Sequence, residues 1–275
     1  MAKIGFIGYG SMGSMIITGF LSSNALKPDE IIISNRTKSK LYNIKKEYPE
    51  IEIAENNLFL ADECEKIFIF VGTNAVKEVI EDIHTKISDK AHIIYIAAAL
   101  TIENVESVFQ GKISKVIPNL TSEVSEGVSL ICHNEKVNEI EAEFVNKLFN
   151  SISTVKIIEE DDFEVGSDLT SCAPAFIAEI FMEFAEASVK NSNFNQEDAN
   201  DMVIKTLYGT AKLLHDKNMS FEELISRVAT KGGITEDGIK VLENKLPGTF
   251  DELFKTTLDK HEQIKSELNC QYNKN

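Results

Sequence analysis

Paired cysteines, long apolar runs and an excess of positive charge are all missing from this 275-residue sequence. Its four cysteines lie far apart and form no Cys-x-x-Cys pair, which argues against a disulfide framework and a zinc site. The five histidines are equally scattered, so we expect no metal. No apolar run reaches the roughly 18 residues that a membrane-spanning helix needs, so we expect no membrane segment.

Positive charge is scarce: 28 Lys and Arg stand against 44 Asp and Glu, for a net charge of −16. Binding to nucleic acid requires clustered basic residues, so we expect no nucleic-acid partner. The N-terminus lacks the pattern of a signal peptide, and we therefore expect a cytoplasmic protein. Only five prolines and an apolar content of 43% indicate a folded chain with a substantial core.

The most informative motif opens the chain, as Lys3-Ile-Gly-Phe-Ile-Gly-Tyr-Gly-Ser-Met-Gly13. An apolar strand leads into Gly8-x-Gly10-x-x-Gly13, and an amphipathic helix follows over Met15–Leu21. This order is that of a dinucleotide-binding turn. Gly8 permits the tight turn, Gly10 lets the backbone approach a pyrophosphate, and Gly13 lets helix and strand pack closely. Ser11 and Met12, at the start of the helix, complete the predicted phosphate site.

Short apolar runs alternate with helical patterns as far as residue 158. The predicted strands are Lys3–Ile7, Glu30–Ser34, Ile51–Ala54, Lys66–Val71, His92–Ala97, Ser114–Ile117, Val128–His133 and Thr154–Ile158, with helices such as Ala75–Lys86 and Asn138–Phe149 between them. This pattern predicts an α/β fold, with an N-terminal Rossmann domain over residues 1–160 and a mostly parallel sheet. The connections before Val128 and after Phe149 are short enough for the last strands to be antiparallel.

Residues 161–275 are predicted to form an all-helical domain. Helical patterns cover residues 163–190, Asn195–Asp216, Ser220–Arg227, Glu236–Leu242 and Pro247–Leu268, and Asn195 and Ser220 are positioned as N-caps. The first of these helices is apolar over too much of its circumference for one domain to cover. We therefore expect it to pack against a second subunit, in a homodimer or a higher homo-oligomer.

The segment after the second strand indicates which dinucleotide binds. An NAD-selective site usually has Asp or Glu there, whereas this chain has Ser34-Asn35-Arg36-Thr37. Arg36 can hold a 2′-phosphate, with the hydroxyls of Ser34 and Thr37 assisting. These residues predict NADP(H) as the cofactor rather than NAD(H). In the alternative interpretation, Arg36 faces solvent at the start of the next helix.

Several segments together resemble pyrroline-5-carboxylate reductase, an NAD(P)H enzyme that forms proline by reducing a cyclic imine. Besides the glycine turn and Ser34–Thr37, they are Ile96-Ala-Ala-Ala-Leu-Thr-Ile102, Lys115-Val-Ile-Pro-Asn119, Glu126-Gly-Val-Ser129, Ala173-Pro-Ala-Phe176 and Gly232-Gly-Ile-Thr235. The resemblance covers nearly the whole chain. It implies that the helical domain dimerises by interleaving and that the active site lies between the cofactor and the Gly232–Gly233 loop of the partner subunit. It also implies that Val71, Gly72, Ala97, Pro118 and Asn119 border the cofactor.

The departures from the family concentrate around the substrate. The family's Ser-Pro-Gly-Gly-Thr-Thr loop, which holds the substrate carboxylate, reads Thr230-Lys-Gly-Gly-Ile-Thr235 here. Gly232, Gly233 and Thr235 are kept, whereas Ile234 lacks the first threonine's hydroxyl. Cys172 replaces a serine. We therefore predict substrate contacts from Gly232, Gly233, Ile234, Thr235 and Cys172, with Thr235 as the catalytic residue whose hydroxyl orients the imine; Cys172 fits a small core residue better than a nucleophile.

Two functions remain open from the sequence. One is NADPH-dependent reduction of 1-pyrroline-5-carboxylate to proline. In the other, the chain resembles the branch of the family encoded in late-competence operons and acts on a different imine or binds a dinucleotide without turnover. The β-hydroxyacid dehydrogenases, which begin with a similar turn, need a lysine on the interdomain helix, and Ser171–Ser188 contains none.

Overall fold

The computed structural model describes residues 3–272, which form two compact units. Of the described residues, the first unit contains 3–172 and 258–272, and the second contains Ala173–Thr257. The expected α/β fold is confirmed. Among the described residues, no helix combines the length and the apolar composition needed to span a bilayer.

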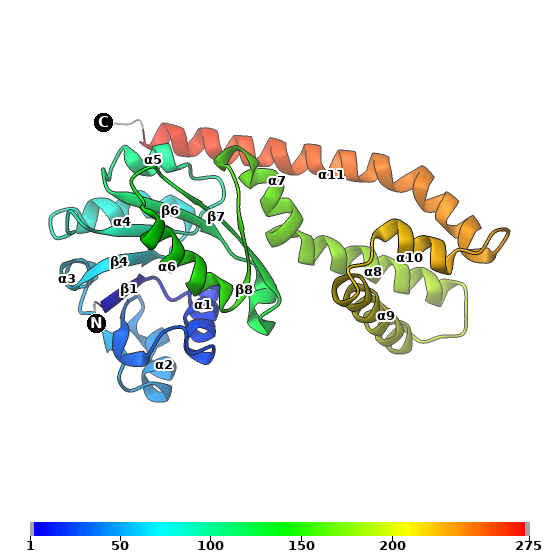
Figure 1. Ribbon diagram of the computed structural model, residues 1–275, viewed down its shortest axis with the longest axis horizontal. Helices are drawn as coiled ribbons and strands as arrows, with labels where there is room; N and C mark the ends of the chain where they lie inside the picture. Colours follow the sequence, from blue (N-terminus) through cyan, green and yellow to red (C-terminus); the bar gives the residue numbers. More distant parts are fainter. Residues whose placement is uncertain (1–2, 273–275) are drawn as a thin grey trace. The chain divides into compact units, whose positions relative to one another are not determined.

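An eight-stranded sheet of order β3-β2-β1-β4-β5-β6-β7-β8 forms the centre of the first unit (Figure 1). The strands are β1 (Lys3–Ile7), β2 (Ile31–Ser34), β3 (Glu52–Ile53), β4 (Cys64–Ile69), β5 (His92–Tyr95), β6 (Lys112–Ile117), β7 (Gly127–His133) and β8 (Ser153–Ile157). Strands β1 to β6 are parallel, β7 is antiparallel to β6, and β8 is parallel to β7. The last two strands therefore both run against the others, as the short connection before β7 allowed.

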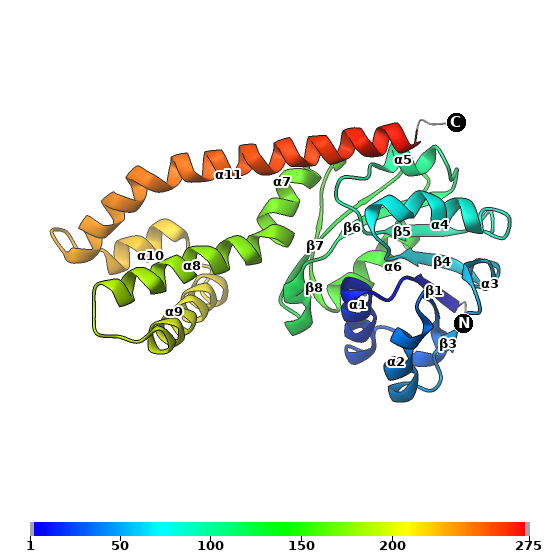
Figure 2. The same ribbon diagram turned by 180° about the vertical axis from the view of Figure 1, so that it is seen from behind.

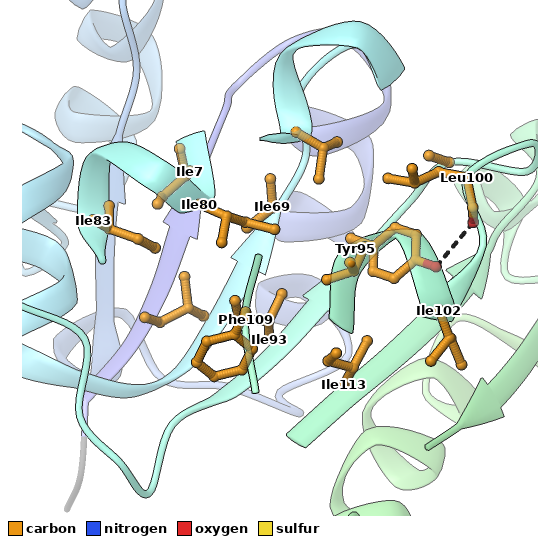
Figure 3. Packing of buried hydrophobic residues seen from close by; sticks show 14 of the residues in the cluster. Ile7, Ile69, Ile80, Ile83, Ile93, Tyr95, Leu100, Ile102, Phe109 and Ile113 are labelled. Carbon is orange, nitrogen blue, oxygen red and sulfur yellow. Dashed lines mark hydrogen bonds between the residues drawn. The ribbon is translucent and has the colours of Figure 1, made fainter. Parts of the chain in front are cut away.

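Helices cover both faces of this sheet (Figure 2). One face packs against α1 (Ser11–Ser22), α2 (Tyr42–Glu47) and α6 (Glu139–Asn150), around stacked rings of Phe6 and Phe68 with centroids 4.8 Å apart. The other face packs against α3 (Asn57–Glu63), α4 (Val76–Ile83) and α5 (Ile102–Glu106). There the Tyr95 hydroxyl donates to the carbonyl oxygen of Leu100 at 2.9 Å, within a core made largely of aliphatic side chains (Figure 3).

The boundary between the units differs from the expected division at residue 160. Helix α7 (Phe163–Ser167) and the π-helical turn η6 (Asp168–Cys172) belong to the first unit, because Phe163 is buried in the sheet core. The end of α11 (Ile234–Tyr272) also belongs there, because Leu268 and Tyr272 are buried in the same core. Sequence patterns give no sign of this return of the chain.

The second unit consists of α8 (Ala173–Lys190), α9 (Gln196–Asp216), α10 (Phe221–Val228) and the first part of α11. Both predicted N-caps are confirmed: Asn195 Oδ1 accepts from the Asp198 N–H at 2.8 Å, and Ser220 Oγ from the Glu223 N–H at 3.1 Å. The prediction of two separate helices around Pro247 was wrong, since one helix of 39 residues runs through it. The helix-forming residues on both sides keep α11 continuous although Pro247 supplies no N–H.

A chain of three polar side chains crosses β5, β6 and β7; His92 and Ser114 are buried and His133 is half-buried. Ser114 Oγ lies 2.6 Å from His92 Nε2 and 2.6 Å from His133 Nδ1. Burial, followed by the charge of Lys66, lowers the pKa of His92 to about 3, and burial also lowers the pKa of His133. Both imidazoles are therefore neutral in the folded protein at neutral pH.

This chain of side chains predicts a loss of stability on mild acidification. In the unfolded state a histidine takes up a proton near pH 6.5, but His92 and His133 resist it when folded. The unfolded state then binds more protons, so the free energy of unfolding falls as the pH drops from about 6.5 toward 5. Urea unfolding at several pH values measures this. His92→Gln should flatten the dependence and the exposed-site control His84→Gln should not; equal slopes in all three proteins would contradict the assignment.

Candidate cofactor and substrate site

The glycine turn between β1 and α1 has the backbone geometry that its three glycines predicted. Gly8 has φ of +106°, and a Cβ placed on it would lie 2.3 Å from the carbonyl oxygen of Phe70. A Cβ on Gly13 would lie 2.7 Å from the carbonyl oxygen of Gly8. A Cβ on Gly10, in contrast, would meet nothing within 4 Å. Gly8 and Gly13 are thus required by packing, whereas the space at Gly10 is free for a ligand.

The polar groups of Ser34 and Asn35 fix the turn to the end of β2. The Gly8 N–H donates to the Ser34 carbonyl oxygen at 2.8 Å, and the Tyr9 N–H donates to Asn35 Oδ1 at 2.9 Å. Asn35 Nδ2 donates to the carbonyl oxygen of Thr37 at 2.8 Å. The buried Ser34 hydroxyl donates to Asn57 Oδ1 at 2.6 Å. Ser34 and Asn35 therefore shape the glycine turn and the loop after β2 through contacts within the protein.

A cavity of about 760 Å³ opens beside this turn. It brings together eight of the predicted cofactor residues: Gly8, Gly10, Ser34, Asn35, Arg36, Thr37, Val71 and Gly72. Ser11 lines a neighbouring cavity of about 470 Å³ instead. Met12, Gly13, Ala97, Pro118 and Asn119 line neither cavity. Gly13 and Ala97 are buried, so they act through packing.

Two cations that line the cavity are available to a ligand. Among the described residues, the side chains of Arg36 and Lys40 make no hydrogen bond or ion pair, whereas the Lys38 ammonium donates to the Ala54 carbonyl oxygen. Such an exposed pair suits a phosphate group. Lys40 was not predicted from the sequence as a cofactor residue. Its position four residues after Arg36, on the turn that follows β2, could have indicated a second cation near the phosphate. Asn57, which holds Ser34 across the cavity wall, was not predicted either.

Asn119, two residues after the end of β6, makes hydrogen bonds within the protein through both its amide oxygen and its amide nitrogen. Its Nδ2 donates to the Thr170 carbonyl oxygen at 3.1 Å, and its Oδ1 accepts from the Thr121 hydroxyl at 3.0 Å and the Val128 N–H at 3.1 Å. The Ser171 hydroxyl donates to the Pro118 carbonyl oxygen at 2.8 Å. The turn η6, which ends at Cys172, is thus held against the Pro118–Asn119 segment.

The Cys172 thiol is half-buried in this turn. Burial, followed by the charge of Asp168 and a hydrogen bond to it, raises the thiol pKa. A raised pKa keeps the sulfur protonated, whereas a nucleophilic cysteine needs a lowered one. The direction of this shift agrees with the expectation that Cys172 is not a nucleophile.

The Gly232–Thr235 segment lies in the second unit, at the start of α11. Gly232 has φ of +73°, and its N–H donates to Glu236 Oε2 at 2.7 Å. Gly233 N–H donates to the Thr230 carbonyl oxygen at 2.9 Å. The Ile234 side chain is exposed, as is Thr235. The turn therefore already binds one carboxylate, from its own helix, through a backbone N–H.

Comparison with known proteins agrees with this combination of a dinucleotide-binding sheet and a helical unit. Residues 3–99 match the family model described as NADP oxidoreductase, coenzyme F420-dependent. Residues 160–264 match the model for pyrroline-5-carboxylate reductase dimerisation. The chain thus joins an oxidoreductase nucleotide domain to a dimerisation domain.

Similar proteins define the family more closely. The chain is 40% identical to pyrroline-5-carboxylate reductase 3 of Bacillus subtilis, over 98% of this chain and 100% of that protein. It is 33% identical to ComE operon protein 4 of the same organism, over 98% and 99%. A solved pyrroline-5-carboxylate reductase from Coxiella burnetii matches with a TM-score of 0.84 and 26% identity, over 97% and 98%. The chain belongs to the pyrroline-5-carboxylate reductase family.

The geometry of the turn separates two glycines by role. Gly10→Ala should leave the melting temperature nearly unchanged, because its methyl group meets open space, but should weaken NADPH binding by about 10-fold or more. Gly8→Ala should instead destabilise the fold by more than about 2 kcal/mol, through backbone strain and the clash with Phe70. Thermal unfolding and NADPH titration measure both effects. Wild-type NADPH affinity in Gly10→Ala would contradict the proposed path of the pyrophosphate.

Proposed function

We propose that this protein reduces 1-pyrroline-5-carboxylate to proline with NADPH. The observation that carries the proposal is the cavity in which the open Gly10 backbone and the unpaired Arg36 and Lys40 lie together. Full-length similarity to a protein named pyrroline-5-carboxylate reductase supports the reaction. The cavity fits the cofactor because a glycine turn and two cations are what a pyrophosphate and a 2′-phosphate need.

In this proposal each group of residues has a distinct role. Residues 8–13 hold the pyrophosphate, and Arg36 and Lys40 hold the 2′-phosphate, with Ser34, Asn35 and Thr37 shaping their loop. Pro118, Asn119 and Cys172 form the wall at the end of β6. The nicotinamide, when bound, supplies the hydride that the imine carbon accepts. The Gly232 N–H binds the substrate carboxylate in exchange for Glu236 Oε2, and Gly233, whose N–H donates to the Thr230 carbonyl oxygen, keeps the turn in shape around that carboxylate. The Thr235 hydroxyl orients the imine nitrogen.

The active form is a homodimer in this proposal. Large apolar side chains of the second unit are exposed in the single chain, among them Phe184 on α8 and Ile204 and Tyr208 on α9. Within α8 and α9, only Ala185 and Ala199 are buried. A second copy of the dimerisation domain would cover these faces. The four free cysteines support a reducing compartment such as the cytoplasm.

A second function is favoured by the substrate loop. Ile234 replaces a threonine of the family pattern, and Glu236 holds the Gly232 N–H that a substrate carboxylate would use. Both changes weaken recognition of a carboxylate. They favour a different cyclic imine, or binding of the dinucleotide without turnover, as alternatives to proline formation.

The two cations predict cofactor selectivity. Arg36→Ala should raise the Kd for NADPH about 10- to 100-fold, the equivalent of about 1.5–3 kcal/mol for a charged hydrogen bond, and leave NADH binding nearly unchanged. Lys40→Ala should act in the same direction. Lys38→Ala is the matched control, because its ammonium already binds the Ala54 carbonyl. If Arg36→Ala weakened both cofactors equally, the 2′-phosphate would lie elsewhere.

Measurements of turnover test the proposed reaction and the proposed substrate contacts. We expect NADPH oxidation with 1-pyrroline-5-carboxylate, with proline as the product, measured beside a panel of cyclic imines that lack the carboxylate. Thr235→Ala should lower kcat/KM roughly 3- to 10-fold, as loss of one neutral hydrogen bond does, and Thr235→Ser should retain it. Ile234→Thr should raise kcat/KM by restoring a hydroxyl. Tight NADPH binding without turnover on any imine would favour the non-catalytic alternative.

A further inference from the structure

The π-helical turn η6 connects the cofactor edge of the sheet to the end of α11. On one side, Thr170 and Ser171 are hydrogen-bonded to the Pro118–Asn119 segment. On the other, Asp168 Oδ1 lies 3.5 Å from His261 Nε2 on α11. Segments with π-helical hydrogen bonding are uncommon and are often found at functional sites. Here the single turn η6 contacts both the Pro118–Asn119 segment and α11.

The Asp168 carboxylate is buried, and burial of a charged group is energetically unfavourable. Its side chain is 1% exposed, and that of His261 is 15% exposed. A carboxylate that leaves water loses several kcal/mol unless a cation and hydrogen bonds compensate it. Its neighbours include His261 and the Cys172 thiol, and the ion pair of Glu164 and Lys265, at 3.5 Å, lies one helical turn away. A residue of this kind fixes geometry, because it is stable in one arrangement only.

The contact with Cys172 connects this carboxylate to the predicted substrate wall. Cys172 follows Asp168 by four residues, and its thiol interacts with the Asp168 carboxylate. His261 contacts the same carboxylate from α11. A series of contacts thus leads from His261 on α11, through Asp168, to Cys172, which we assign to the substrate side.

We propose that Asp168, braced by His261, is a positioning residue that fixes the π-helical turn and the Cys172 thiol for hydride transfer. This inference rests on the proposed function for its catalytic part. Neither Asp168 nor His261 lines the cofactor cavity. Their replacement should therefore change kcat and leave the Kd for NADPH unchanged.

The kinetic experiment compares Asp168→Ala, Asp168→Asn and His261→Ala with the matched control Glu164→Gln. Asp168→Ala should lower kcat about 10-fold with the Kd for NADPH unchanged, and Asp168→Asn, which keeps the shape and the hydrogen-bonding oxygen, should recover most of it. His261→Ala combined with Asp168→Ala should be no worse than Asp168→Ala alone, because the two act as one unit. Glu164→Gln should keep the wild-type kcat. Wild-type kcat in Asp168→Ala would overturn the catalytic part.

A second readout does not depend on turnover. In a Cys270→Ser background, which removes the exposed cysteine, the pH dependence of alkylation by iodoacetamide reports the Cys172 thiol, because Cys64 and Cys132 are buried. Asp168→Asn should lower the pKa of this thiol by removing the neighbouring negative charge, and Glu164→Gln should not. An unchanged pKa in Asp168→Asn would overturn the positioning role. Absence of turnover in the wild type would overturn the proposed function alone, and the thiol titration would still decide the positioning role.

Discussion

The close approach of the β1–α1 turn to the end of β4 is the constraint on which the cofactor cavity depends. A Cβ at Gly8 would lie only 2.3 Å from the Phe70 carbonyl oxygen, so no side chain fits there. The same approach directs the Tyr9 N–H toward Asn35 and begins α1 at Ser11. This approach thereby fixes the relative positions of three features: the N-terminus of α1, the open space at Gly10 and the loop that carries Arg36. A ligand that binds at one of these three points is therefore also within reach of the other two.

Side-chain amides extend this arrangement across the sheet edge. Asn35 joins the glycine turn to the Arg36 loop, and Asn119 joins the end of β6 to the start of β7 and to the turn η6. Each amide makes hydrogen bonds inside the protein through both its oxygen and its nitrogen. The residues that touch a ligand can therefore differ among relatives without loss of the scaffold, because different side chains hold the backbone in place.

Local patterns predicted much of this structure, and long-range packing decided the rest. All eight strands were found to within a few residues, because apolar runs bounded by turn residues are a local property. The grouping of Phe163, Leu268 and Tyr272 into one core was not predictable, since these residues meet only in the folded chain. The role of Lys40 was not predictable either, because only the folded structure places it, without a partner among the described residues, beside Arg36 in the cavity. Nor was that of Asp168, whose contact His261 lies far along the chain. The continuity of α11 through Pro247 was not predicted, because the helical patterns on its two sides are separate in the sequence.

In the proposed function, the turn at Gly232 keeps the backbone of a carboxylate site while a neighbouring side chain competes for it. Its backbone still presents an N–H to a carboxylate, and Glu236 supplies one from within the same helix. A substrate carboxylate must exchange with Glu236, so one charge-assisted hydrogen bond replaces another and the net gain on binding is small. A substrate that binds through its ring alone makes no such exchange. If the loop binds the substrate as we propose, the strength of the Gly232–Glu236 hydrogen bond sets the balance between proline formation and reduction of other imines.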